Sequence, residues 1–205
     1  MVGLFAFFAA FLLYPIWLTV QGGFEGRDGG FTMHHILTVF NDPVLLDGFL
    51  NALGIAVGTT LLCIIIALPL ATLAARYTFP FKGVFSALVL VPLILPPFVG
   101  AIGLHHLLGK YGAINTLLVD MGLFSEGYDF IGNGGFWAIV FIEALHLYPI
   151  LYLNATAALA NLDPALEEAA ENMGATPWQR FRQIILPLIR PGLFAGATIV
   201  FIWSF

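Results

Sequence analysis

Long stretches with almost no charged residues constrain this chain more than any other feature of its sequence. Residues 2–20, 49–75 and 83–108 contain no Asp, Glu, Lys or Arg, and residues 134–159 contain one acidic residue, Glu143. A run of about 20 apolar residues is long enough to cross the hydrocarbon core of a bilayer as a helix. Because backbone groups in lipid must bond to one another, these runs predict membrane-spanning α-helices.

A fifth uncharged stretch occupies residues 192–205, which is 14 residues. At 1.5 Å per residue it would extend about 21 Å, short of the roughly 30 Å hydrocarbon core. The sequence therefore predicts an all-α, polytopic membrane protein, a helical bundle whose fifth span is incomplete. Residues 1–205 are expected to form a single, incomplete transmembrane domain. The composition agrees, because 9% of the residues are charged, against about 25% in soluble domains.

The basic residues predict how the chain is oriented in the membrane. Five of the seven lie in two connections, one after the second span and one after the fourth, which share one side. Basic residues mark the cytoplasmic side, so the N-terminus is expected inside. The net charge of −5 offers no basic patch, and no nucleic-acid partner is expected. The five basic residues are Arg76, Lys82, Arg180, Arg182 and Arg190.

Four residues within the spans are candidates for a translocation path. Glu143 and His146 are three residues apart and share a helix face. Such ionisable groups either serve function or hydrogen-bond to neighbouring helices, and the sequence leaves both open. Pro92, Pro96 and Pro97 must break or kink the third span. Non-helical backbone at that depth is tolerated beside a water-filled cavity, which indicates a path through the membrane.

Nucleotide, metal and catalytic sites are not expected. Residues 103–111 resemble a phosphate-binding loop, but five residues separate the glycines instead of four, and Tyr111 replaces the required Ser or Thr. The adjacent histidines at 34–35 and 105–106 would point about 100° apart on a helix and seldom bind one ion. We therefore predict no metal, no cofactor, no catalytic residue and no enzymatic activity within the chain.

Residues 161–191 form the longest connection on the side that carries most of the basic residues, and their sequence predicts two short helices. Asp163 before a proline is a helix N-cap, and Gly174 is a typical C-terminal stop. Thr176 begins a capping box that starts a second helix, which is expected to end before Pro187. Because such a helix pair is too small to have its own core, we expect it to dock on another protein.

The same connection carries a specific motif. Glu-Ala-Ala is followed after three residues by Gly, and after nine more by Ile-x-Leu-Pro. This pattern resembles the EAA loop of inner-membrane permease subunits of bacterial ABC importers, and the topology resembles the type I permease fold. The residues that match are Glu168, Ala169, Ala170, Gly174, Ile184, Leu186 and Pro187.

The resemblance implies a function and a set of partners. Residues 161–191 would be the cytoplasmic coupling loop, with its first helix seated in a groove of a separate ATPase subunit that hydrolyses ATP. The expected partners are cytoplasmic ABC ATPase subunits, a second permease half or subunit, a periplasmic substrate-binding protein and membrane lipid. The chain would then form the substrate path across the bacterial inner membrane.

A narrower resemblance concerns the substrate. Residues 92–100 and 108–112 resemble the N-terminal half of tandem permeases for ferric iron, or the related phosphonate and polyamine systems. The alternative function is a secondary transporter powered by protons through Glu143 and His146. Dependence of uptake on an ATPase subunit or on a proton gradient would separate the two functions.

Overall fold

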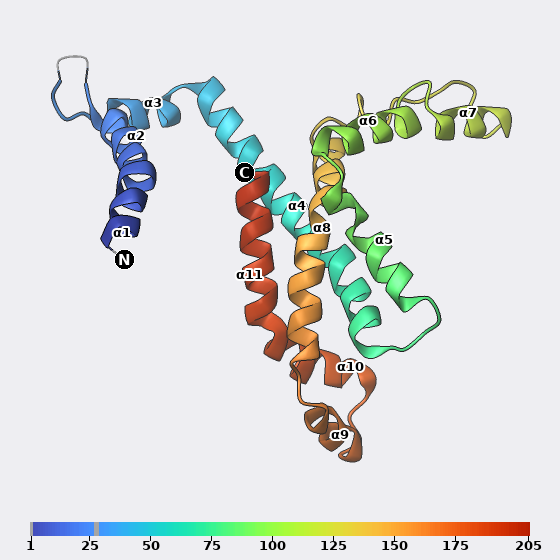
Figure 1. The fold of residues 1–205 in the computed structure, drawn as a ribbon. Coiled ribbons are helices and arrows are strands. Elements are labelled where there is room, and N and C mark those ends of the chain that lie inside the picture. The colour runs from blue at the N-terminus through green and yellow to red at the C-terminus, as the bar shows by residue number, and fades with distance from the viewer. Residues whose placement is uncertain (1, 27–28) are drawn as a thin grey trace. The chain divides into compact units, whose positions relative to one another are not determined.

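The computed structural model describes residues 2–26 and 29–205, and these form helices together with one isolated antiparallel bridge between Glu25 and Phe31 (Figure 1). The chain divides into two compact units, Met1–Asn51 and Ala52–Phe205. The sequence-based assignment of residues 1–205 to one permease domain stays a prediction.

The first unit begins with a continuous apolar helix. Its 22 residues Gly3–Phe24 are apolar enough to cross a membrane, in agreement with the span predicted at 2–20. In the most apolar part of this helix no residue is buried. A short helix and the start of a long one follow. The elements are α1 (Val2–Phe8), the π-helical turn η1 (Ala9–Leu13), α2 (Tyr14–Phe24), α3 (His34–Asn41) and the first residues of α4 (Pro43–Arg76).

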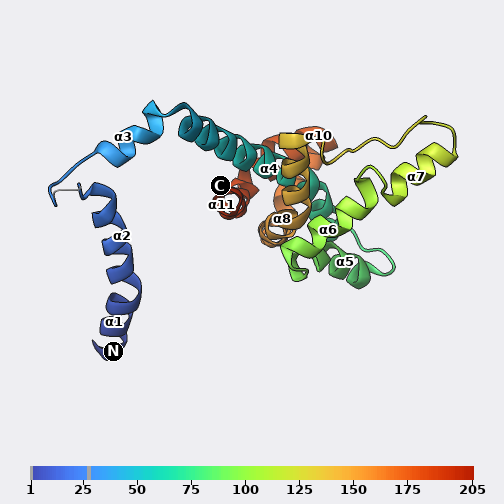
Figure 2. The ribbon, with the colours of Figure 1, turned by 90° about the horizontal axis from the view of Figure 1, so that it is seen from above.

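The second unit is a bundle in which α4, α8 (Gly135–Ala160) and α11 (Leu186–Ser204) lie side by side (Figures 1 and 2). Buried positions on α4 recur every three or four residues and are mostly small. Small side chains let membrane helices approach closely, which is the main source of helix association in lipid. Those buried residues are Ala56, Thr59, Cys63, Ala67, Ala71 and Ala74.

The third predicted span is broken by its prolines. Helix α5 (Lys82–Ile94) is followed by α6 (Pro97–Leu108), and the chain bends by 103° between the helical segments on either side of the break. Leu95 and Pro96 between them are extended, with ψ of 136° and 139°, because a residue that precedes proline avoids the α conformation. The predicted break is confirmed at Pro96 and Pro97, whereas Pro92 lies inside α5 and does not end that helix. Beyond it lies α7 (Ala113–Asp120).

The last helix starts earlier than the sequence indicates. It runs from α10 (Pro177–Arg180) through the π-helical turn η2 (Phe181–Ile185) into α11, and 28 residues, Pro177–Ser204, form one candidate span. The expectations that the helix ends before Pro187 and that the span starts at residue 192 are therefore wrong. In η2 the Leu186 N–H bonds to the Phe181 carbonyl. Such a π turn adjusts the hydrogen-bond ladder locally, so the missing proline N–H does not stop the helix.

We predict that adding one methyl group to the seam between α8 and α11 destabilises the bundle. A Cβ at Gly192 would lie 2.7 Å from the Cβ of Ala158, which cannot rotate away, whereas a Cβ at Gly83 would meet nothing within 4 Å. Gly192→Ala should lower the free energy of unfolding by about 1–3 kcal/mol through overpacking. The control Gly83→Ala should be neutral or stabilising by up to about 1 kcal/mol. Thermal unfolding of the two purified variants in detergent measures these changes. Equal unfolding midpoints for the two variants would contradict the tight packing of α8 against α11 at Gly192.

Candidate functional site

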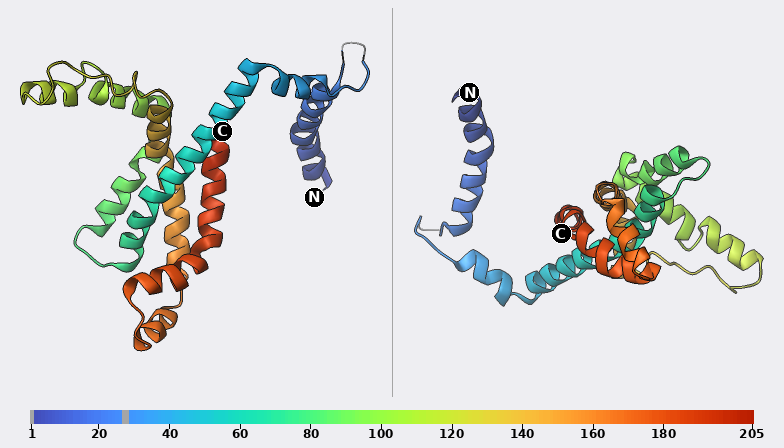
Figure 3. Two further views of the ribbon diagram at one scale, coloured as in Figure 1. Left: turned by 180° about the vertical axis from the view of Figure 1, so that it is seen from behind. Right: turned by 90° about the horizontal axis from the view of Figure 1, so that it is seen from below.

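Helix α9 (Pro164–Asn172) lies beyond the end of α8, at one end of the bundle (Figures 1 and 3). The backbone N–H of Ala165 donates to Asp163 Oδ1 over 2.9 Å, and this N-cap starts the helix. Gly174 has a φ of +83°, a conformation that favours glycine, and it turns the chain after the helix. The capping box between Thr176 and Gln179 then starts α10. The caps predicted at Asp163, Gly174 and Thr176 are confirmed.

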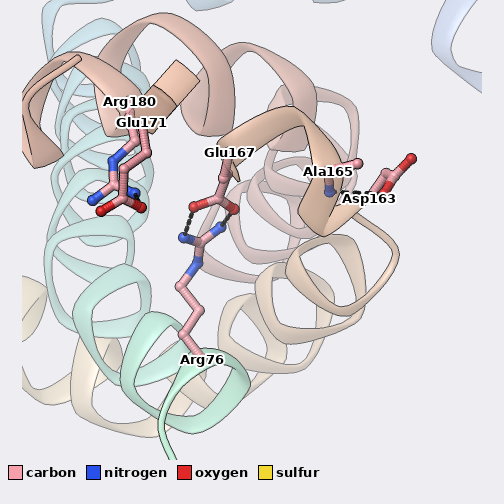
Figure 4. Close-up of polar contacts among 6 residues, drawn as sticks. All are labelled: Arg76, Asp163, Ala165, Glu167, Glu171 and Arg180. Carbon is pink, nitrogen blue, oxygen red and sulfur yellow. Dashed lines mark hydrogen bonds and ion pairs between the residues drawn. The ribbon is translucent and has the colours of Figure 1, made fainter. Parts of the chain in front are cut away.

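One face of α9 is fixed to the rest of the unit by charge. Arg76, the last residue of α4, donates from both terminal nitrogens to the two carboxylate oxygens of Glu167 (Figure 4). Arg180 of α10 bonds to Glu171 over 2.5 Å. Ala170, which precedes Glu171 on the same helix, is buried, with 3% of its surface exposed. The two basic connections therefore meet at the same end of the unit, as the sequence predicts.

The opposite face of α9 is apolar and exposed. Leu166 is 48% exposed and Met173 is 83% exposed, and Ala169 between them is also exposed. These residues are spaced at i, i+3 and i+7, which places them along one side of a helix. Glu168 lies beside them and is exposed too. An apolar stripe with an acidic neighbour on a helix outside the bundle is suited to contact another protein.

The structure thus separates the residues of the predicted coupling loop into three groups. Glu168 and Ala169 are exposed on α9, whereas Ala170 of the same helix is buried. Gly174 is exposed in the turn that follows. The remaining residues, Ile184, Leu186 and Pro187, are half-buried in η2 and the start of α11, in the helix that leads into the last span.

Sequence reasoning missed the contacts that hold α9. It used Arg76 and Arg180 only to orient the chain, and it assigned no role to Glu167 and Glu171. The i, i+4 spacing of these two acids was the available signal, because it places both on one helix face. Their basic partners lie in other elements, and only the fold reveals which bases these are. The stripe that includes Met173 could have been found from its helical spacing alone.

Glu143 joins three helices of the bundle. Its Oε2 accepts a hydrogen bond from the Thr59 hydroxyl of α4 over 3.4 Å, and another from the Ser204 hydroxyl of α11. Thr59 is fully buried and Ser204 is 8% exposed. A carboxylate among apolar helices is costly unless it has such donors. Glu143 therefore does hydrogen-bond to neighbouring helices, which is one of the two roles that the sequence left open.

His146 lies in different surroundings, although it shares α8 with Glu143. It lines a cavity of about 270 Å³ that α8 forms with α5 and α6 beside the break in the third span. Pro96 begins α6 as its N-cap residue, and Pro97 is the first residue of that helix; the side chain of Pro97 lies outside the described part of the structure. The other lining residues are Pro92, Leu95, Gly100, Ala101, Leu104, Ile142, Leu145 and Tyr148.

Comparison with known proteins assigns this architecture to a family. Residues 67–205 match the model of the family described as "Binding-protein-dependent transport system inner membrane component". A spermidine/putrescine transport system permease protein, PotB of Haemophilus influenzae, is 30% identical over 203 residues, which cover 96% of this chain and 70% of the relative. A putative ferric transport system permease protein, FbpB 1 of the same species, is 32% identical over 174 residues, 84% of this chain and 26% of the relative.

A solved structure has the same fold. The chain is similar to a bacterial alginate ABC transporter crystallised with an alginate pentasaccharide-bound periplasmic protein, with a TM-score of 0.73, 22% identity, and coverage of 97% of this chain and 68% of the other. The helical bundle thus has the fold of a type I importer permease. From the family match and the close relatives, this chain belongs to the binding-protein-dependent inner-membrane components, the permease subunits of ABC importers.

Proposed function

We propose that this chain lines part of the substrate path of an ABC importer in the bacterial inner membrane and contacts a separate ATPase subunit through α9. The observation that carries the proposal is the two-faced character of this helix. Glu167 and Glu171 fix one face to the bundle, while Leu166, Ala169 and Met173 leave the other exposed. A partner groove can bury that apolar stripe and gain free energy from its removal from water.

The connectivity of α9 supports transmission of movement into the membrane. Three residues, 161–163, join it to α8. On its other side the turn at Gly174 leads into the uninterrupted helix of 28 residues, Pro177–Ser204. When ATP closes an ATPase dimer, the displaced α9 would move both spanning helices. Two permease halves would then alternate between outward- and inward-facing states, with a periplasmic binding protein delivering substrate.

The translocation path is proposed to pass the break in the third span. The cavity at His146 lies there, and the extended Leu95 and Pro96 supply backbone that is not committed to a helix. Pro97 continues this break at the start of α6. Glu143 is proposed to act at the edge of the path by holding α4 and α11 to α8, because its carboxylate already has donors from both.

The substrate is proposed to be a small charged solute. The two relatives described above are permeases of a polyamine system and of a ferric system, and both match at least 84% of this chain. Ferric iron and putrescine are therefore the substrates to test. Uptake of labelled putrescine and of ferric iron by cells that express the transporter decides between them. If neither is taken up, the substrate is another solute.

We predict that Gly174→Val lowers ATP-driven uptake at least about tenfold while the chain still inserts into the membrane. A β-branched residue at positive φ costs roughly 1–2 kcal/mol and would displace the turn after α9. Gly122 is the matched control, since its φ is +71° and a Cβ at either glycine meets nothing within 4 Å. Gly122→Val bears the same backbone cost far from α9 and should retain uptake. Equal loss in both variants would reject the coupling role of the turn.

The orientation with the N-terminus and α9 in the cytoplasm is tested by cysteine labelling. Met33, Thr78 and Ser125 are exposed and lie in three different connections, and the native Cys63 is buried. Because five of the seven basic residues mark the α9 end as inside, a cysteine at Thr78 should react with an impermeant maleimide only after cells are permeabilised. Cysteines at Met33 and Ser125 should react in intact cells. The reverse pattern would invert the proposed topology.

A last prediction separates ATP-driven import from the proton-coupled alternative. Glu143→Gln keeps an acceptor for Thr59 and Ser204, so ATP-driven uptake should stay within about twofold of the parent. Glu143→Ala removes that acceptor and should lower the free energy of unfolding by about 1 kcal/mol. Uptake into vesicles with and without ATP, under an imposed proton gradient, makes the distinction. Gradient-driven uptake without ATP that is lost in Glu143→Gln would support the alternative.

A further inference from the structure

We propose that the ion pair between Arg76 and Glu167 is the mechanical link that makes α4 move together with α9, so that these two residues are positioning residues for coupling. The inference rests on the proposed contact between α9 and an ATPase subunit. It extends that function, because it says how movement reaches a spanning helix that does not adjoin α9 in the chain.

The connectivity of the unit sets the problem that the pair solves. Helices α8 and α11 receive any displacement of α9 through the chain itself, by way of residues 161–163 and the helix Pro177–Ser204. Helix α4 has no such connection, because Arg76 and Glu167 are 91 residues apart in the sequence. Movement of α9 can reach α4 only through non-covalent contacts.

The packing of α4 within the bundle is poorly suited to this task by itself. The fully buried residues of α4 nearest to Arg76 are small, while larger α4 side chains are only partly buried against the core. The small ones are Cys63, Ala67, Ala71 and Ala74, and the larger ones are Leu62, Ile64, Leu68 and Leu70. Small residues allow close approach but offer few projecting groups that interlock along the helix axis. The fully buried part of the seam therefore gives little resistance to sliding along the helix axis, and a directional contact at the end of α4 would add to the resistance of the larger side chains.

The geometry of the pair provides that directional contact. Two parallel N–H···O bonds between a planar guanidinium and a carboxylate fix both distance and rotation. The side chains of Arg76 and Glu167 are 24% and 21% exposed, whereas Glu171 in the neighbouring pair with Arg180 is 64% exposed. Ion pairs shielded from water are less weakened by solvent and salt than exposed ones.

The surroundings of the guanidinium reinforce the argument. The Nε of Arg76 is buried and has no acceptor among residues 2–26 and 29–205, while both terminal nitrogens of this guanidinium donate to Glu167. Loss of the Glu167 carboxylate would leave the half-buried guanidinium without a compensating negative charge. The guanidinium would then move toward water, and α4 would separate from α9. The pair is thus required for the contact and is not replaceable by the neighbouring pair, which joins α9 to α10.

The first test measures coupling in the assembled transporter, as the ratio of substrate imported to ATP hydrolysed. Glu167→Gln and Arg76→Gln should each lower this ratio roughly fivefold while ATP hydrolysis persists, and the exchanged variant Arg76→Glu/Glu167→Arg should restore most of it. The comparison variant Glu171→Gln breaks the more exposed pair, which joins α9 to α10, and should lower the ratio less than Glu167→Gln does. Rescue by exchange distinguishes a required pair from two residues that merely support folding.

The second test measures the movement itself. Spin labels at Tyr77, just beyond α4, and at Asn172, the last residue of α9, are both on exposed positions. In the parent complex their distance distribution should be the same without nucleotide and with nucleotide trapped, because the two helices move as one body. In Glu167→Gln the distribution should differ between the two states. A parent complex in which the distance changes with nucleotide would overturn the link.

Failure of this inference can be told apart from failure of the proposed function. A parent complex that imports substrate with ATP, and whose Glu167→Gln variant keeps the full import ratio, would overturn the link and leave the coupling role of α9 intact. A parent chain that neither binds an ATPase subunit nor supports ATP-driven uptake would overturn both.

Discussion

The close approach of α4, α8 and α11 is the constraint on which the second unit depends. Lipid gives no hydrophobic reason for apolar helices to associate, so their stability rests on packing and on the few polar bonds between them. Small residues permit the packing, and Gly192 leaves no room for a single added carbon against Ala158. Glu143 adds the polar bonds, because Thr59 and Ser204 bring donors from the two neighbouring helices to one carboxylate.

The prolines show how neighbouring residues decide the effect of one residue type. Pro69, Pro149 and Pro191 lie inside long helices that continue past them. At Pro96 and Pro97 the chain bends instead, since each proline forces the residue before it out of the α conformation and two successive residues become extended. A single proline costs one hydrogen bond, which a membrane helix tolerates, whereas the pair interrupts the helix and opens a cavity beside His146.

Helix α9 combines a rigid attachment with an unsatisfied surface. Its caps at Asp163 and Gly174 define where it starts and stops, and its inner face is held by Glu167 and Glu171. Met173 and its stripe stay exposed on the outer face. A helix held on one side and exposed on the other can pass on the movement of a bound partner without refolding, which is what the proposed coupling to an ATPase subunit requires.

The amino-acid sequence is enough to predict the helical class, the break at Pro96 and the caps of α9, because these follow from local rules: apolar length, proline sterics and side-chain bonds to nearby backbone. It misplaced the start of the last span, since a π turn before Pro187 lets a helix continue where a local rule predicts an end. The contacts of Arg76 with Glu167 and of Glu143 with Ser204 depend on the fold and could not be predicted. Those partners are far apart in the chain, and it is the packing of the helices that brings their charges and hydroxyls within bonding distance.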